Sequence, residues 1–192
     1  LQIEGQLCFD KCAHGRNVAV VLELVVQGLK VRGTRRCQIF GSDAEADIAG
    51  VFSNLTRIIR ANRGTIDKYM GDCVMAFWGA PVETPEHAHL AVKSAIEMAA
   101  AVRDINMDHQ SRGLPDIGIG IGINTGQMCV GDMGSNIRRA YTVIGDSVNL
   151  GSRLEGLSKT YGVDIVVSET TRKLATEFAW QELDRVRVKG KA

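Results

Sequence analysis

The sequence has few aromatic residues, three prolines and no apolar run long enough to cross a bilayer. Aromatic side chains make up 5% of its 192 residues. The longest apolar run, Val18 to Val26, is interrupted by Glu23, whereas a membrane-spanning helix needs about 20 apolar residues. The sequence therefore predicts no transmembrane helix. Because the chain begins at Leu1, we expect it to be a fragment, which leaves room for an upstream sensor or membrane domain.

Paired cysteines and an excess of charge are also missing. The five cysteines are odd in number, lie scattered along the chain and form no CxxC pair, so a zinc site is not predicted. A reducing, cytoplasmic compartment is the simpler inference. The net charge of +1 gives no sign of a nucleic acid or a membrane surface as a partner. What is present, 45% hydrophobic and 23% charged residues, is typical of a single globular domain.

A β-hairpin is predicted over Thr65 to Gly79, TIDKYMGDCVMAFWG, because strand-forming residues flank the pair Gly71-Asp72. An aspartate at such a tip projects its carboxylate outward, where a hard cation such as Mg²⁺ can bind it together with phosphate oxygens. Lys68 lies four residues earlier in the same element. The alternative for Asp72 is a solvated turn residue, which is the commoner role of a Gly-Asp pair.

A strand followed by a helix is predicted within Arg139 to Glu155, RAYTVIGDSVNLGSRLE. The helix opens near Asp146 or Ser147, which are both good N-cap residues. Asn149 and Arg153 are four residues apart, so they share one face of its first turns. An amide and a guanidinium near a helix N-terminus suit a phosphate group. The alternative is a pair of surface residues on an amphipathic helix.

The other elements mix helices and strands, so the predicted fold class is α+β, with an antiparallel-rich sheet and helices packed on it. Their bounds follow from hydrophobic periodicity and from capping residues. We expect a buried strand over 18–26, a helix over Ser42–Asn62, a helix capped by Thr84 with Pro85 at its first position and ending near His109, strands over Ile117–Asn124, Met128–Gly131 and Val163–Val167, a short helix capped by Ser168 and ending at Leu174, and a final strand over Trp180–Val188.

The motifs occur in the order found in a known family. KYMGDCVMAFWGAP is followed by YTVIGDSVNLGSRLEGL, with GIGINTG between them and RVRVKGK near the end. In these four motifs the chain resembles the catalytic domain of class III nucleotidyl cyclases, specifically the bacterial adenylate cyclases. The resemblance covers about Ser42 to Lys191 and implies a ferredoxin-like core. We therefore divide the chain into a poorly matching N-terminal segment, 1–41, and a nucleotide cyclase catalytic domain, 42–192.

The resemblance implies that the chain converts ATP into 3′,5′-cyclic AMP and pyrophosphate, through attack of the ribose 3′ oxygen on the α-phosphate. It also implies two Mg²⁺ or Mn²⁺ ions as cofactors, with Asp72 as a metal ligand. By matching position, Asn149 orients the ribose, Arg153 stabilises charge on the α-phosphate, and Lys189 holds the terminal phosphates. The alternative for Lys189 is an exposed tail lysine.

Base recognition and assembly follow from the same resemblance. Lys68 and Thr142 match the pair that reads adenine, since an ammonium donates to N1 and a hydroxyl accepts from the exocyclic amine. Guanylate cyclases typically carry Glu and Cys at these two places, so we predict ATP rather than GTP as the substrate. The family also implies a homodimer with two shared sites, in which Asp72 comes from one chain and the other site residues come from its partner.

One family motif is missing. Cyclases of this type carry the pattern F-x-D-I-x-x-F-T on a strand, and its aspartate is the other metal ligand. Spacing places it near Gly28 to Lys30, where no acidic residue stands. Glu23 and Asp10 are the nearest carboxylates, and neither lies in the family pattern. Gly120 is a milder departure, because some relatives have a phosphate-binding arginine there.

Two functions therefore stay open. The first is an adenylate cyclase whose N-terminal segment is aberrant or diverged. The second is a catalytically silent cyclase-homology module that dimerises or binds nucleotide, because a metal ligand has been lost. A diguanylate cyclase relative is a weaker third reading, since no GGDEF-like string occurs.

Overall fold

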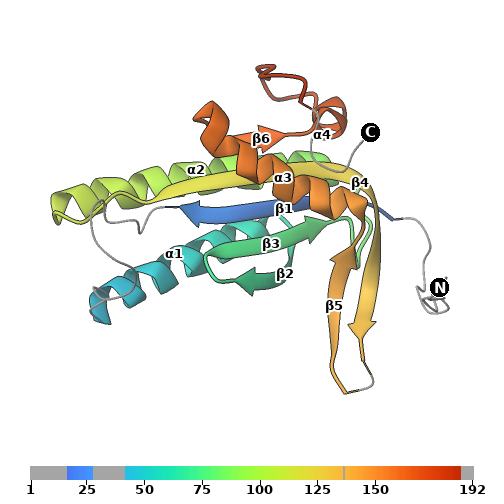
Figure 1. Ribbon diagram of the computed structural model, residues 1–192, viewed down its shortest axis with the longest axis horizontal. Coiled ribbons are helices and arrows are strands. Elements are labelled where there is room, and N and C mark those ends of the chain that lie inside the picture. The colour runs from blue at the N-terminus through green and yellow to red at the C-terminus, as the bar shows by residue number, and fades with distance from the viewer. Residues whose placement is uncertain (1–16, 28–41, 136, 187–192) are drawn as a thin grey trace, which may run out of the picture.

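The computed structural model describes residues 17–27, 42–135 and 137–186 of the chain. In chain order the elements are β1 (Asn17–Gln27), α1 (Ser42–Ala61), β2 (Thr65–Met70), β3 (Cys73–Trp78), α2 (His87–Ser111), β4 (Gly118–Gly134), β5 (Arg139–Ile144), α3 (Asp146–Tyr161), β6 (Ile165–Val167) and α4 (Glu169–Leu174). The strands form one sheet in the order β2-β3-β1-β4-β5 (Figure 1). Strand β6 pairs with β4 in parallel, and the other pairs are antiparallel. The predicted α+β class with an antiparallel-rich sheet is confirmed.

Strand β1 lies at the centre of this sheet, between β3 and β4. Its sequence, NVAVVLELVVQ, is apolar at most positions, as expected for a strand that is covered on both faces. It pairs with β3 from Val20 to Val25 and with β4 along its whole length. The strand predicted over 18–26 is thus confirmed, and its pairing fixes the β2–β3 hairpin relative to β4.

Helices α1 and α2 pack against each other and enclose the main hydrophobic core with one face of the sheet. Helix α1 buries Val51, Leu55 and Ile59, which recur every four residues along one stripe. Helix α2 contributes mostly small residues and Met98, which let it lie close to the strands. The largest fully buried side chains of this core are Trp78, Leu22, Leu55, Ile59, Met98, Ile121 and Ile123.

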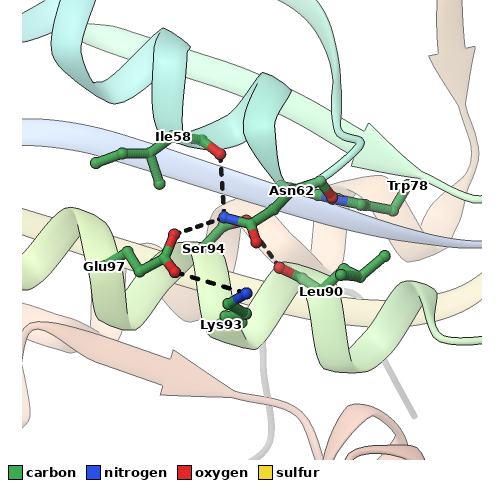
Figure 2. Close-up of polar contacts among 7 residues, drawn as sticks. All are labelled: Ile58, Asn62, Trp78, Leu90, Lys93, Ser94 and Glu97. Carbon is green, nitrogen blue, oxygen red and sulfur yellow. Dashed lines mark hydrogen bonds and ion pairs between the residues drawn. The ribbon is translucent and has the colours of Figure 1, made fainter.

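A polar cluster ties the end of α1 to α2 and to β3 (Figure 2). Asn62 is 5% exposed, and its side-chain nitrogen donates to Ile58 O at 3.1 Å and to Glu97 Oε2 at 2.6 Å. The carbonyl of Asn62 accepts from Trp78 Nε1 at 2.8 Å. Two residues on, Gly64 has no room for a side chain, because an added Cβ would lie 2.6 Å from the Trp78 ring. These contacts set where β2 starts and so position the hairpin.

Strand β4 runs unbroken for 17 residues and belongs to two parts of the sheet. Its first part pairs with β1 and β6, and its second part pairs with β5 to form an arm that projects from the molecule (Figure 1). The prediction of two separate strands over Ile117–Asn124 and Met128–Gly131 is wrong, because Asn124 to Gly126 continue the strand. Strand β1 pairs with β4 through this stretch as far as Met128, which holds it extended.

The helix boundaries near residue 85 differ from the prediction, whereas those near residue 168 agree with it. Helix α2 starts at His87 with Glu86 as its N-cap residue, and no side chain caps it. Thr84 Oγ1 instead donates to Val82 O at 3.2 Å, so this residue closes a local turn rather than a helix end. Helix α4 is capped by Ser168, whose Oγ accepts from Thr171 N at 3.3 Å.

The final strand predicted from Trp180 is not formed over its described part, 180–186. Trp180 Nε1 donates to Ala175 O at 3.0 Å, which directs the ring toward α4 rather than along a sheet edge. Leu183 and Val186 are 40% and 43% exposed, so the apolar alternation that suggested a strand finds no partner strand here. Among the helices that the structure describes, none is long and apolar enough to cross a membrane.

Candidate active site

The β2–β3 hairpin places Asp72 at its tip, as predicted. Met70 at the end of β2 pairs with Cys73 at the start of β3, which leaves Gly71 and Asp72 as the turn. Gly71 has a φ of 63°, in the left-handed region that glycine adopts readily. Asp72 is exposed, so its carboxylate is open to a cation or to solvent.

In the described backbone of β1, the acidic residue nearest this tip along the strand is Glu23. Val25 pairs with Cys73, and the four residues of β1 nearest the tip, 24–27, read LVVQ. Glu23 pairs with Met75, two positions further from the tip, which is about 7 Å along a strand. Gln27 ends the strand, and the positions 28–30 expected from spacing lie outside the described ranges, as does Asp10.

The metal-binding capacity of the tip is therefore limited. In the described ranges, no group of three or more His, Cys, Asp or Glu residues is placed to hold a metal ion. A single exposed carboxylate suits one hard cation that also binds substrate phosphates. It does not fit a centre for two cations, which needs further ligands to hold both ions side by side.

Lys68 forms an ion pair with Asp67, a contact that the sequence did not predict. A β-bulge lies between Ile66 and Lys68 in the pairing of β2 with β3. The side chain of Asp67 is 1% exposed and that of Lys68 is 44% exposed, with Lys68 Nζ 3.3 Å from Asp67 Oδ2. Asp67 Oδ2 has no hydrogen bond of good geometry from the residues described, so the ammonium offsets its buried charge. Strand alternation would have placed the two side chains on opposite faces, and a bulge has no clear signature in the sequence.

Strand β5 carries the other predicted base-reading residue. Thr142 pairs with Gly131 of β4, and its hydroxyl oxygen is buried without a partner in the part of the chain that the structure covers. Next to it, Tyr141 packs against Phe77 of β3, with ring centroids 6.2 Å apart. Partial burial, and then the charge of Asp132 across the strand pair, raise the pKa of Tyr141 above its usual value. Both causes favour the neutral phenol over the phenolate.

Helix α3 carries Asn149 and Arg153 in its N-terminal half, as predicted. The predicted caps Asp146 and Ser147 are wrong, because Gly145 is the N-cap residue and makes no side-chain bond. Its φ of 154° favours glycine, so the chain turns there and the helix begins one residue later. Asn149 is exposed, and Arg153 is half-buried with its Nη1 atom buried and unpartnered among the described residues.

Helix α3 lies close against β4 because the strand has glycine at two places beneath it. An added Cβ at Gly122 would lie 2.2 Å from Gly151 O, and one at Gly126 would lie 2.3 Å from Ser147 Oγ. Between these glycines, Asn124 Nδ2 donates to Ser147 O at 2.7 Å. The three strand residues share one face of β4, since they are two apart. They form a seat that fixes the helix and the two candidate side chains on it.

Within one chain the candidate residues fall in two places. An apolar cluster joins β5 and the start of α3 to β3, so Thr142 and Asn149 come from neighbouring elements. Strand β2, which carries Lys68, also contacts β5. The cluster comprises Met75, Phe77, Ala80, Met128 and Val143, with Val130 and Val148 packed on it. Asp72 lies five residues from Phe77 at the other end of β3, which is about 17 Å in a strand. Lys189 lies outside the described ranges. Within one chain, Asp72 and the contact between Phe77 and Tyr141 thus lie toward opposite ends of β3.

Comparisons with known proteins agree with this architecture. The family model described as adenylate and guanylate cyclase catalytic domain matches residues 35–192. Adenylate cyclase 1 of Rhizobium meliloti (strain 1021) is 37% identical over 123 residues, which are 64% of this chain and 18% of that protein. An adenylate cyclase of Anabaena cylindrica is 40% identical over 133 residues, which are 67% of this chain and 26% of that protein. The chain thus spans roughly a quarter or less of these relatives.

A solved structure shows the same fold. The adenylyl cyclase CyaB from P. aeruginosa matches with a TM-score of 0.80 and 28% sequence identity, over 92% of this chain and 90% of that one. The likeness extends over the sheet and its helices, so the core arrangement expected from the sequence motifs is confirmed.

Proposed function

The chain belongs to the adenylate and guanylate cyclase catalytic domain family, and on that premise we propose that it converts ATP into 3′,5′-cyclic AMP and pyrophosphate. The observation that supports this most directly is a pair of buried polar atoms, Thr142 Oγ1 and Arg153 Nη1, that find no partner among the described residues. Buried polar groups in folded proteins nearly always have a partner. A bound nucleotide supplies one for each, with the base at Thr142 and a phosphate at Arg153.

The reaction needs positioning and charge stabilisation more than covalent chemistry from the protein. The ribose 3′ oxygen forms a bond to the α-phosphorus, the bond to the β-phosphate oxygen breaks, and the 3′ hydroxyl proton is released. Asn149 orients the ribose, and Arg153 offsets the negative charge that grows on the α-phosphate. Lys189 would hold the terminal phosphates. The packing of α3 on β4 keeps the positions of Asn149 and Arg153 fixed relative to each other during this step.

Divalent cations are expected from the family, and Asp72 would hold one Mg²⁺ or Mn²⁺ ion together with the phosphates. Such an ion neutralises phosphate charge and favours ionisation of a bound hydroxyl. A second ion lacks an acidic ligand among the described residues near the tip. No step of the proposed reaction is therefore assigned to a second ion.

ATP is proposed as the substrate rather than GTP. Lys68 donates to adenine N1, and Thr142 accepts from the exocyclic amine. The ion pair with Asp67 supports this role, because it restrains the Lys68 ammonium. The double variant Lys68→Glu with Thr142→Cys should erode the preference for ATP, measured as the ratio of kcat/KM for the two nucleotides. Unchanged ratios would show that these residues do not read the base.

A shared site is proposed, in which Asp72 comes from one chain and Lys68, Thr142, Asn149 and Arg153 come from a second chain. The separation of Asp72 from the β5–α3 region within one chain supports this arrangement. Two-fold symmetry then gives two equivalent sites per homodimer. The cytoplasmic location and any upstream sensor or membrane domain remain predictions from the sequence.

A catalytically silent module is the second candidate, and the run LVVQ in β1 beside the hairpin tip favours it. The two candidates are separated by incubating the chain with ATP and Mn²⁺ and measuring cyclic AMP. The cyclase proposal predicts product above the protein-free background, and loss of that product in Arg153→Ala and Asp72→Ala. A folded chain that makes no cyclic AMP, and gains none from any change in the metal-binding half, would instead be the silent module.

A further inference from the structure

Strand β2 turns two consecutive side chains to the same face of the sheet. Ile66 packs on the core beneath α1 and α2, and Tyr69 contacts Phe52 of α1 with ring centroids 5.9 Å apart. Strand faces alternate, so a regular strand would place Ile66 and Tyr69 on opposite faces. The bulge between Ile66 and Lys68 supplies the extra residue. Asp67 and Lys68 therefore both lie on the other face.

That other face carries the candidate site for the base. Lys68 pairs with Met75, a member of the apolar cluster that joins β3 to β5 and to the start of α3. Strand β2 also contacts β5, which carries Thr142. The side chain of Lys68 is 44% exposed, whereas that of Asp67 is 1% exposed. The ammonium is therefore the end of the ion pair that a ligand can reach, and the carboxylate is the buried end.

The carboxylate of Asp67 depends on that ammonium. Lys68 Nζ lies 3.3 Å from Asp67 Oδ2, and this oxygen accepts no hydrogen bond from the described residues. A buried charge without a partner is strongly unfavourable, so removing one partner of such a pair is more damaging than replacing both. A neutral residue at position 68 would leave the carboxylate without its cation. An acidic residue there would place a like charge beside it.

We propose that Asp67 is a positioning residue for the choice of base: its buried carboxylate requires a cation at position 68 and holds that cation where it donates to adenine N1. The inference rests on the proposed function and deepens it, because it assigns base selection to a residue that does not touch the base. Guanine presents an N1–H donor and so requires an acceptor at position 68. An acidic acceptor would be repelled by the Asp67 carboxylate. Asp67 therefore favours ATP and opposes GTP.

Binding of 3′-deoxy-ATP, which lacks the attacking hydroxyl, tests this role without catalysis. Asp67→Asn keeps the shape of the side chain and removes its charge, so the Lys68 ammonium loses its restraint. With Mn²⁺ present, we expect the dissociation constant of 3′-deoxy-ATP to rise about tenfold, as for a weakened hydrogen bond to a charged group. The 1-deaza form of this ligand has carbon in place of N1, so its dissociation constant should not change. A purely structural role would weaken both ligands equally.

Glu169→Gln is the matched control. It also removes the carboxylate of an ion pair, since Glu169 Oε1 lies 2.8 Å from Lys173 Nζ on α4, but both of these side chains are exposed. This variant should bind both ligands as the natural chain does. Urea unfolding verifies that each variant is folded, and Asp67→Ala takes the place of Asp67→Asn if the latter does not fold.

Exchange of the base gives a second, independent measurement. The double variant Lys68→Glu/Thr142→Cys should lose binding of 3′-deoxy-ATP and gain little binding of 3′-deoxy-GTP, because the introduced carboxylate lies beside that of Asp67. Adding Asp67→Asn removes the repulsion. The triple variant should bind 3′-deoxy-GTP about tenfold more tightly than the double variant, since like charges in contact cost at least that much. It should also unfold at a higher urea concentration.

The outcomes separate this inference from the proposed function. Equal losses for 3′-deoxy-ATP and its 1-deaza form in Asp67→Asn, or no loss for either, would show that Asp67 does not act through Lys68. A double variant that binds 3′-deoxy-GTP as tightly as the triple variant would show that Asp67 does not oppose guanine. In these cases the cyclase proposal stands and the inference is wrong.

The reverse combination is equally distinct. A natural chain that binds 3′-deoxy-ATP through N1, and loses this binding in Asp67→Asn, yet makes no cyclic AMP from ATP, would overturn the cyclase proposal and keep the role of Asp67. A folded natural chain that does not bind 3′-deoxy-ATP would overturn both.

Discussion

Among single residues, Asn62 has contacts that reach three elements, because it joins the end of α1 to α2 and to β3. Asn62→Ala removes its two donated hydrogen bonds, one of which goes to the charged Glu97. We expect the free energy of unfolding to fall by about 1–3 kcal/mol, measured by urea denaturation. Ser53→Ala is the control, since Ser53 is exposed and bonds only within its own helix, to Ala49 O at 2.7 Å. Equal losses in both variants would contradict the proposed bridging role.

The phenol of Tyr141 gives a prediction for alkaline pH. Its pKa lies above the usual 10.0, first because of burial and then because of Asp132. A raised pKa in the folded state means that the neutral phenol is favoured by folding. This contribution to stability is fully present below pH 10.0 and is lost as the pH rises through the folded-state pKa.

Asp132→Asn should therefore lower the pKa of Tyr141 without bringing it to the ordinary value, since burial remains. Phenolate absorbance during a pH titration measures the change, and subtraction of the Tyr141→Phe titration isolates this tyrosine from the others. A pKa that does not respond to Asp132→Asn would show that the carboxylate has no influence on the phenol.

At the scale of elements, the seat of α3 on β4 can be tested with two glycines of the same strand. An added Cβ at Gly122 meets backbone of α3 at 2.2 Å, whereas one at Gly131 meets nothing within 4 Å. We expect Gly122→Ala to destabilise the fold by about 1–3 kcal/mol and to lower nucleotide cyclisation, because the helix must shift. Gly131→Ala should change stability by less than about 1 kcal/mol. Unfolding curves and cyclic AMP assays of the two variants make the comparison.

The sequence predicted best those elements whose signals are local. The Gly71-Asp72 turn, the apolar run of β1 and the stripe of α1 each determine an element with little help from distant residues. The predictions failed where pairing with residues far away in the sequence determines the local structure. Asn124 to Gly126 have the composition of a turn, yet β1 keeps them extended. The alternation after Trp180 resembles a strand, but no neighbouring strand accepts it in the described ranges.

The same distinction between local signals and distant pairing applies to the residues of the candidate site. Motif order predicted Lys68, Asp72, Thr142, Asn149 and Arg153 as site residues, and the structure shows which elements carry them. It took the pairing register of β1 to find that Val25 stands beside the hairpin tip, because spacing alone pointed to Gly28 to Lys30. Asp67 was missed since a bulge, rather than any residue pattern, buries its side chain.

At the scale of the whole molecule, a site shared by two chains makes activity depend on protein concentration. Cyclic AMP formation per subunit should fall as the protein is diluted below the dissociation constant of the dimer. Sedimentation across the same concentration series locates the transition between dimer and monomer. The two curves should coincide. Activity per subunit that stays constant down to monomeric dilution would show that one chain contains a complete site.

Strand β4 has one more consequence, since it passes from the main sheet into the arm without interruption. Thr142 of β5 pairs with its outer part, and α3, which carries Asn149 and Arg153, packs on its inner part. The arm and the packing surface of α3 are therefore connected by one continuous strand. A movement of β4 would therefore carry Thr142, Asn149 and Arg153 together and preserve the spacing between them.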